Sequence, residues 1–266
     1  MAATVHDVAQ LALRGNASGG AAVRTVSRFL FRDLRRHARL LLFNSEFTRA
    51  EFTRCVGVSP AEKVVTPLGV EPRWFDAIPS PAAAVPYFVC VGNVRPHKNL
   101  RLLLTAFMRV AVEVPHKLVV IGQHSGFRTR DEDVLKDLNA PGDRVQFLGS
   151  LPDALVHQLV AGADAMILPS LYEGFGLPAL EAMAAKCMVL ASTAGALPEI
   201  CGNAARYFDP TSVEALTALL REQASMDQHQ RNAWVERGQE RARQFTWNHT
   251  ADLTANALER ILQSGN

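Results

Sequence analysis

The sequence predicts an α/β fold in which buried parallel strands alternate with helices. Short apolar runs rich in β-branched residues recur between Tyr87 and Phe208, as in strands covered on both faces. Helical patterns separate these runs, and strand–helix alternation at this spacing favours a doubly wound parallel sheet. In such a sheet, ligands bind beyond the carboxyl ends of the strands.

The first part of the chain, residues 1–78, contains fewer elements than a complete Rossmann-like domain. It shows the end of one strand at Thr4–Val5 and two further strands, Leu40–Phe43 and Lys63–Thr66. Helices are expected at Ala21–Arg36 and Glu46–Val56. Three strands are too few for an independent domain of this class, so we predict a partial N-terminal Rossmann-like domain.

A linker and a complete domain follow. The segment around Pro79, Pro81 and Pro86 is rich in alanine and proline, as in linkers. We predict a Rossmann-like domain over residues 79–245 and a separate C-terminal helix over 246–266. Its predicted strands are Tyr87–Val91, Lys117–Ile121, Arg144–Leu148, Ala165–Leu168, Met188–Ala191 and Arg206–Phe208; the predicted helices are Leu100–Val114, Asp131–Leu138, Asp153–Ala161, Pro178–Ala185, Val213–Ala224, Gln228–Gln244 and Trp247–Gln263.

Composition argues against nucleic acid as a partner, against a cysteine metal site and against a membrane-spanning or secreted protein. The net charge is only +2, with 28 basic and 26 acidic residues, so no overall field points to nucleic acid. The 4 cysteines lack the spacing of a metal site, and free thiols fit a reducing compartment. No apolar run reaches the roughly 18 residues of a membrane span, and the N-terminus lacks a signal-peptide pattern. These features predict a cytoplasmic protein.

Charge is nevertheless concentrated in residues 28–39. This stretch holds several arginines and a histidine, interleaved with apolar residues such as Phe29 and Leu30. A basic amphipathic helix of this kind can lie on an anionic membrane surface. The alternative is an ordinary solvated helix face.

The most specific motif runs from Ser170 to Glu181. It follows an apolar strand, and Glu173 and Glu181 bracket a turn that contains Gly174 and Gly176. Pro178 then suits the first turn of a helix. Glycine allows a ligand to approach the backbone, and the free amides of a helix start favour an anion. This pattern predicts a phosphate-bearing ligand flanked by two carboxylates, although strand–glycine loop–helix units also occur throughout α/β domains.

Three further loops follow predicted strands. Gly92 precedes Arg95 and Lys98, and Asn99 then stands at a helix N-cap position, an arrangement suited to a pyrophosphate. A solvent-exposed basic loop is the alternative. Gly122 and Leu151 lie in the two other loops. The acidic triplet Asp131-Glu132-Asp133 falls at a helix start, where acids favour the helix dipole, so we expect no metal site.

These motifs together resemble one enzyme family. The two glutamates of Ser170–Glu181 resemble the E-x7-E signature of the retaining glycosyltransferases of family 4, which have the GT-B fold. Lys98 matches the phosphate-contacting lysine of that family, whereas Arg95 is a weaker match. His6-Asp7 resembles the family's histidine–aspartate element, and it precedes Ser45-Glu46-Phe47 in the family order.

The resemblance implies roles for these residues. Glu181 would bind the ribose of a nucleotide-diphosphate sugar, and Glu173 with the backbone around Phe175 would hold the hexose. Lys98 and Arg95 would neutralise the diphosphate leaving group without a metal, and His6 would reach the sugar across the cleft. The remaining expected donor contacts are Gly92, Gly122, Leu151, Gly174, Gly176 and Leu177.

The resemblance also implies a substrate and raises an alternative. The combination of His6-Asp7 with Pro96-His97-Lys98-Asn99 is similar to bacterial mannosyltransferases of polysaccharide assembly, which suggests GDP-mannose and a saccharide or lipid-linked acceptor. The partial first domain implies an N-terminally truncated member of the family. A non-catalytic nucleotide-sugar-binding fragment is therefore the alternative. An NAD-dependent enzyme is disfavoured, because no G-x-G-x-x-G follows the first strand of the second domain.

Overall fold

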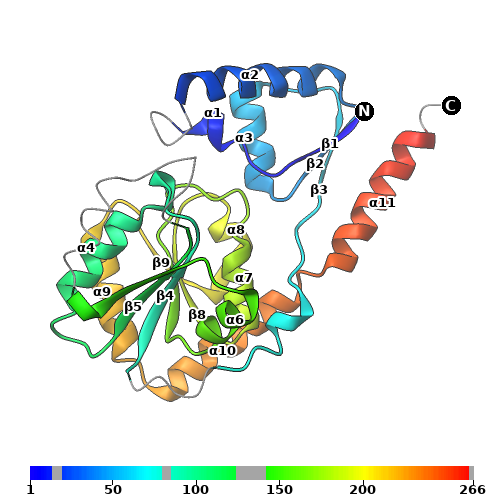
Figure 1. The fold of residues 1–266 in the computed structure, drawn as a ribbon. Helices are drawn as coiled ribbons and strands as arrows, with labels where there is room; N and C mark the ends of the chain where they lie inside the picture. Colours follow the sequence, from blue (N-terminus) through cyan, green and yellow to red (C-terminus); the bar gives the residue numbers. More distant parts are fainter. Residues whose placement is uncertain (14–19, 80–84, 124–141, 264–266) are drawn as a thin grey trace.

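The computed structural model describes residues 1–13, 20–79, 85–123 and 142–263, which form two parallel sheets (Figure 1). The first sheet has the order β1-β2-β3, with β1 at Ala2–Val5, β2 at Leu40–Phe43 and β3 at Glu62–Val65. The second has the order β6-β5-β4-β7-β8-β9. Its strands are β4 (Tyr87–Val91), β5 (Lys117–Ile121), β6 (Val145–Gly149), β7 (Ala165–Leu168), β8 (Met188–Ser192) and β9 (Arg206–Phe208). Every pairing in both sheets is parallel, which confirms the predicted α/β class.

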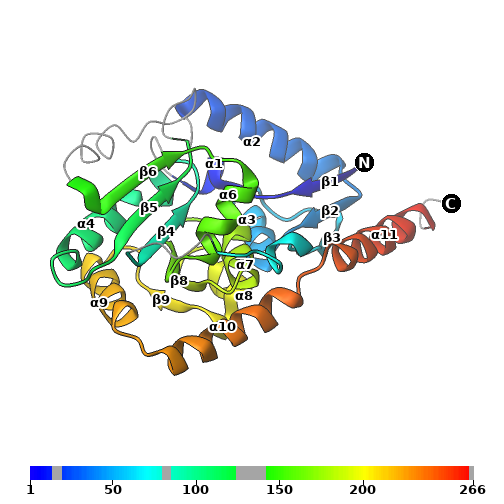
Figure 2. The same ribbon diagram turned by 60° about the horizontal axis from the view of Figure 1, so that its bottom comes forward.

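Helices cover both faces of the first sheet. After the short α1 (Ala9–Ala12), α2 (Gly20–His37) and α3 (Glu46–Val56) pack on one face, around Phe43 and Phe52. The C-terminal helix α11 (Trp247–Gln263) covers the other face, where Ala257 lies against Leu40 and Leu42 (Figure 2). The last helix of the chain therefore packs on the first sheet.

The second sheet is likewise covered on both faces. Helices α4 (Leu100–Val110) and α9 (Val213–Ala224) bury Phe107 and Leu220 against one face. Helices α6 (Asp153–Ala161), α7 (Leu177–Ala184), α8 (Leu197–Cys201) and α10 (Gln228–Arg243) cover the other. Single turns of 3₁₀ helix, η2 (Pro72–Trp74), η3 (Pro96–Lys98), η4 (Gly142–Arg144) and η5 (Gly202–Ala204), lie in the connections. The sheet order reverses between β4 and β7, which places a ligand crevice beyond their carboxyl ends.

Element boundaries differ from the prediction in a few places. Helix α4 ends at Val110 rather than Val114, and residues 111–113 form a turn. Pro115 has no N–H to donate to the Ala111 carbonyl, so the helical hydrogen bonds cannot continue there. Strand β6 starts at Val145 instead of Arg144, and α8 is an additional short helix. The predicted helix Asp131–Leu138, with the acidic triplet, lies outside the described residues. Within the described ranges, every helix is too short or too polar to cross a membrane.

Candidate functional site

Two loops at the carboxyl ends of β4 and β5 pack backbone against backbone. The Gly92 amide donates a hydrogen bond to the Ile121 carbonyl at 2.9 Å. Gly122 has a φ of 149°, and a Cβ atom there would overlap the Gly92 carbonyl. Only glycine fits this position without moving one of the loops. The two loops are therefore in direct backbone contact at the carboxyl ends of β4 and β5.

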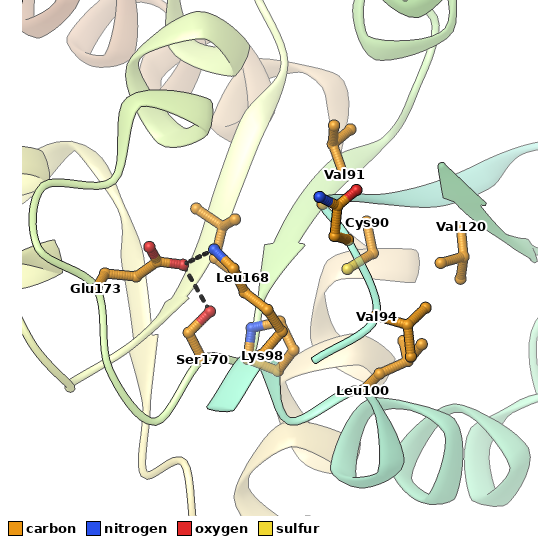
Figure 3. Close-up of a pocket in the computed structure, with 12 residues that line it drawn as sticks. Cys90, Val91, Val94, Lys98, Leu100, Val120, Leu168, Ser170 and Glu173 are labelled. Atoms are coloured by element: carbon orange, nitrogen blue, oxygen red, sulfur yellow. Dashed lines mark hydrogen bonds and ion pairs between the residues drawn. The ribbon is translucent and has the colours of Figure 1, made fainter. Parts of the chain in front are cut away.

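An ion pair lies beside the loop that contains Gly92 (Figure 3). Lys98, in η3 after β4, places its ammonium Nζ 2.6 Å from Oε1 of Glu173, in the loop after β7. The Ser170 hydroxyl donates to the same oxygen at 2.7 Å. The Glu173 side chain is only 11% exposed, so both partners hold it in one position. These residues line a narrow pocket together with Gly92, Val94 and Leu168.

The η3 turn that carries Lys98 is held in place by hydrogen bonds to neighbouring loops. Asn99 occupies the N-cap position of α4, as predicted, but its side chain makes no cap hydrogen bond. Its backbone has a φ of 56°. Its side-chain Nδ2 donates to the carbonyls of Pro169 and Pro210 at 3.0 and 2.8 Å. The Leu171 amide also donates to the His97 carbonyl at 2.7 Å. The β4 and β7 loops are therefore tied together.

In the described part of the chain, the side chains of two predicted site residues form no hydrogen bond or ion pair with Lys98 or Glu173. Arg95 is exposed, and among the described residues its side chain forms no ion pair. His6 is also exposed, and its carbonyl accepts a hydrogen bond from the Asn44 side chain at 2.8 Å. His97, which the prediction did not assign a role, is partly buried, and this burial lowers the pKa of its imidazole. Its Nδ1 atom has no hydrogen-bond partner among the described residues.

Beyond Glu173, the chain turns sharply into α7. Gly176 has a φ of 100°, which favours glycine, and a Cβ there would lie 2.7 Å from Leu197. Phe175 is buried and Leu177 opens the helix, with Pro178 in its first turn. The predicted turn and helix start are therefore present, with the free amides of α7 near the same sheet edge.

Glu181, one turn into α7, has a different environment from Glu173. Burial raises the pKa of its carboxyl group to about 7, and a hydrogen bond from Trp74 opposes that rise. Trp74 lies in the connection between the two sheets, and its ring packs against His157 of α6 with the ring centroids 4.0 Å apart and the planes tilted by 48°. Leu151, in the loop before α6, packs against the hydrophobic cluster that contains Trp74. Trp74 was not predicted, and a lone tryptophan outside any predicted element gave no signal for it.

The first domain reaches the Glu173 loop through the start of α3. Ser45 caps this helix and accepts a hydrogen bond from the Thr48 amide at 3.0 Å. The hydroxyls of Ser45 and Thr48 both donate to the Gly174 carbonyl, at 2.6 and 2.9 Å. Glu199 of α8 accepts from the amides of Glu46 and Phe47 at 2.8 and 2.9 Å. Sequence reasoning missed these cross-domain contacts.

Comparison with known proteins places this geometry among glycosyltransferases. Residues 76–241 match the family described as "Glycosyl transferases group 1". The chain is 36% identical over 239 residues to O-antigen chain mannosyltransferase B of Escherichia coli, an alignment that covers 84% of this chain and 61% of the relative. It is 32% identical over 229 residues to the MMP α-(1→4)-mannosyltransferase of Mycolicibacterium hassiacum, covering 84% of this chain and 54% of that protein. The chain thus spans a little more than half of these relatives' length.

Solved structures show the same fold. Sucrose-phosphate synthase from Thermosynechococcus elongatus superimposes with a TM-score of 0.80 at 24% identity, covering 99% of this chain and 68% of that one. Anabaena HepE, in complex with UDP and glucose, gives a TM-score of 0.78 at 19% identity, covering 97% and 71%. These likenesses establish a GT-B-like α/β fold.

Proposed function

Because the chain belongs to the glycosyl transferases group 1 family, we propose that it transfers mannose from a nucleotide-diphosphate sugar, with GDP-mannose as donor. The main observation in support is the Lys98–Glu173 ion pair, which lies where the sheet order reverses. The Ser170 hydroxyl donates a hydrogen bond to the same carboxylate. A carboxylate can accept hydrogen bonds from sugar hydroxyls, and an ammonium can neutralise the diphosphate that leaves. The printed names of the two similar mannosyltransferases favour mannose as the sugar.

Each part of the site receives a role in this proposal. Glu181 binds the ribose hydroxyls, and the close backbone of the Gly92 and Gly122 loops admits the nucleotide. The amides from Gly174 to Leu177 face the hexose and its phosphates, in line with the anion preference of a helix start. Lys98 and Arg95 supply positive charge to the leaving group, so that the transfer needs no metal ion. The anomeric configuration is retained.

The acceptor side completes the proposal. His6 lies at the end of β1, on the first-domain side of the Glu173 loop: a Cβ on Gly174 would be 2.6 Å from the His6 carbonyl. We assign this side to a saccharide or lipid-linked acceptor. The alternative is a fragment that binds the nucleotide sugar without turnover, which the partial coverage of the relatives keeps open.

Binding and turnover separate these two readings. Isothermal titration of the chain with GDP, GDP-mannose, UDP-glucose and a dTDP-sugar tests the donor, and release of GDP from GDP-mannose tests catalysis. Glu173→Gln removes the charge of the carboxylate, and Glu113→Gln is the matched control, since Glu113 is an exposed partner of Arg221.

We expect GDP-mannose to bind, GDP to be released, and Glu173→Gln alone to abolish release. Binding without release would favour the fragment, whereas tighter binding of a UDP-sugar would overturn the choice of donor. A chain that binds none of these nucleotides would overturn the proposed function as a whole.

We further propose that α2 brings the protein to an anionic membrane surface on the cytoplasmic side. This helix lies on the outside of the first sheet (Figure 1), where Phe29 is 72% and Leu30 56% exposed. Arg28, Arg32 and Arg36 are exposed on the same helix. Apolar side chains flanked by arginines suit the boundary between acidic headgroups and acyl chains.

Vesicle sedimentation tests this contact. Vesicles with one-third phosphatidylglycerol should bind the chain, and vesicles of phosphatidylcholine alone should not. Phe29→Ser and Arg32→Glu should each reduce binding, whereas Arg101→Glu, an exposed site on α4, should not. Equal binding of both vesicle types, or of all variants, would contradict the proposal.

A further inference from the structure

The peptide that joins Gly174 to Phe175 is held by the first domain, although both residues belong to the second. The Gly174 carbonyl accepts hydrogen bonds from the Ser45 and Thr48 hydroxyls, at 2.6 and 2.9 Å. Both hydroxyl-bearing residues are fully buried at the start of α3. Two donors on one carbonyl fix the orientation of the peptide plane, because the peptide is planar.

That orientation determines where the next amide points. The peptide joining Gly174 and Phe175 is trans, so its N–H points away from its carbonyl. The carbonyl faces α3, and the Phe175 N–H consequently faces the opposite side of the loop. Within the described residues, the Phe175 N–H has no hydrogen-bond acceptor. A donor without a partner beside a held carboxylate is free to bind a ligand oxygen.

Other contacts keep the loop and α3 in register. The Glu173 carbonyl accepts from the Ala196 amide at 2.9 Å, which holds the loop on its second-domain side. The Glu199 carboxylate binds the free amides of Glu46 and Phe47, so the start of α3 is docked directly on α8. A side chain on Gly174 would collide with the backbone at His6 and with Asp7, so this approach of the two domains requires glycine. The hydroxyls of Ser45 and Thr48 are therefore placed by the docked helix.

We infer that Ser45 and Thr48 are positioning residues for the donor sugar. They aim the Phe175 N–H, and with it the Glu173 loop, at the hexose, so that sugar recognition depends on the apposition of the two domains. The inference rests on the proposed function, and it deepens that function: nucleotide binding belongs to the second domain alone, whereas sugar binding requires α3. Neither hydroxyl touches substrate in this account.

Thr48→Val is the decisive variant, because valine keeps the shape of threonine and removes only the hydroxyl. Ser45 still caps α3 and still binds the Gly174 carbonyl in this variant, so the fold is preserved. Thr53→Val is the matched control: Thr53 is exposed on the same helix, and its hydroxyl donates to the Arg49 carbonyl of that helix. Thr48→Ser restores a hydroxyl and serves as the rescue.

The measured quantity is the ratio of the affinity for GDP-mannose to the affinity for GDP, both determined by isothermal titration. We expect Thr48→Val to weaken GDP-mannose binding and to slow GDP release by about fivefold, as for one lost hydrogen bond, while the Kd for GDP stays within about twofold. Thr53→Val should match the unmodified chain, and Thr48→Ser should recover most of the loss. A purely structural role would lower GDP and GDP-mannose binding together.

The outcomes separate this inference from the function on which it rests. If Thr48→Val and Thr53→Val give the same ratio of GDP-mannose to GDP affinity, the positioning role is wrong and the proposed function stands. Parallel loss of both affinities also overturns the positioning role. If the unmodified chain binds neither GDP-mannose nor another nucleotide sugar, the proposed function fails and the positioning role fails with it.

Discussion

Glu173 and Glu181 stand eight positions apart in one loop–helix unit, yet the structure surrounds them with opposite chemistry. The Glu173 carboxylate has an ammonium at 2.6 Å and a hydroxyl at 2.7 Å, and the carbonyl of the next residue, Gly174, is held by the first domain. Glu181 is largely buried beside Trp74, and this burial raises the pKa of its carboxyl group to about 7. The carboxylate proposed to meet the sugar is thus charge-paired and tied to both domains. The one proposed to meet the ribose depends on burial and on the connection between the domains.

Loss of the cation should have the largest effect on the Glu173 side. Lys98→Met keeps the length of the side chain but leaves Glu173 without its ion-pair partner and the proposed leaving group without its charge. We expect about a hundredfold loss of GDP release from GDP-mannose, as for removal of one electrostatic group in an active site. Steady-state kinetics checks it, with Arg101→Met on the exposed face of α4 as control. Equal rates in the two variants would contradict the role of Lys98.

The contact between the domains is tested by filling the space at Gly174. In Gly174→Ala, the new Cβ would lie 2.6 Å from the His6 carbonyl and 2.9 Å from Asp7. Because backbone must move, we expect a loss of about 1–3 kcal/mol in the free energy of unfolding, measured in urea. The affinity for GDP-mannose should fall together with this stability, while the affinity for GDP, which is bound on the Glu181 side, should persist. Gly238→Ala is the control, because the nearest atoms to its new Cβ belong to Met183 and lie 3.3 Å or more away.

The contrast between the two glutamates also explains which features were predictable from sequence. Strands such as Ala165–Leu168 and the turn through Gly176 could be predicted, because burial on both faces and a sharp strand–helix connection leave local patterns. The contacts of each glutamate could not. Lys98 and Glu173 are 75 positions apart, and Ser45 and Gly174 are 129 apart, so nothing local encodes their meeting.

The first domain illustrates the same limit. The cap at Ser45 was predictable because a hydroxyl before a helix has a local role, whereas its second bond, to the Gly174 carbonyl, depends on how two sheets dock. The side chain of Asn99 was misjudged for a related reason. Its side-chain Nδ2 donates to the carbonyls of two distant loops, and in this orientation the side-chain oxygen accepts no cap hydrogen bond from α4.

The raised pKa of Glu181 predicts a pH dependence of stability. Between pH 4.5 and about 7 the unfolded chain has lost this proton while the folded chain retains it, so stability from this group falls as pH rises through that range. Glutamine cannot ionise. Relative to the unmodified chain, Glu181→Gln should therefore gain about 1–3 kcal/mol in unfolding free energy between pH 5 and pH 7.5. Urea unfolding at both pH values checks this, with the exposed Glu259→Gln as control; a difference that does not change with pH would contradict it.

The smallest effect should come from Trp74, and it tests whether the Glu181 side is tuned from the connection between domains. The hydrogen bond from Trp74 lowers the pKa of Glu181 against the effect of burial. Trp74→Phe keeps an aromatic ring against His157 but removes the donor, so the pKa of Glu181 should rise further. A ribose hydroxyl donates best to the ionised carboxylate, and GDP should consequently bind about threefold more weakly at pH 7.5. The midpoint of the pH dependence of GDP binding should also move upward.

Titrations with GDP from pH 6 to pH 9 measure both changes. The exposed Trp247→Phe should leave them unchanged, and at high pH, where Glu181 is ionised in either chain, the affinity of Trp74→Phe should approach that of the unmodified protein. A uniform weakening at every pH would mean that Trp74 acts by packing alone. Glu181 would then owe its protonation to burial, and of the two glutamates only Glu173 would depend on its contacts with the first domain.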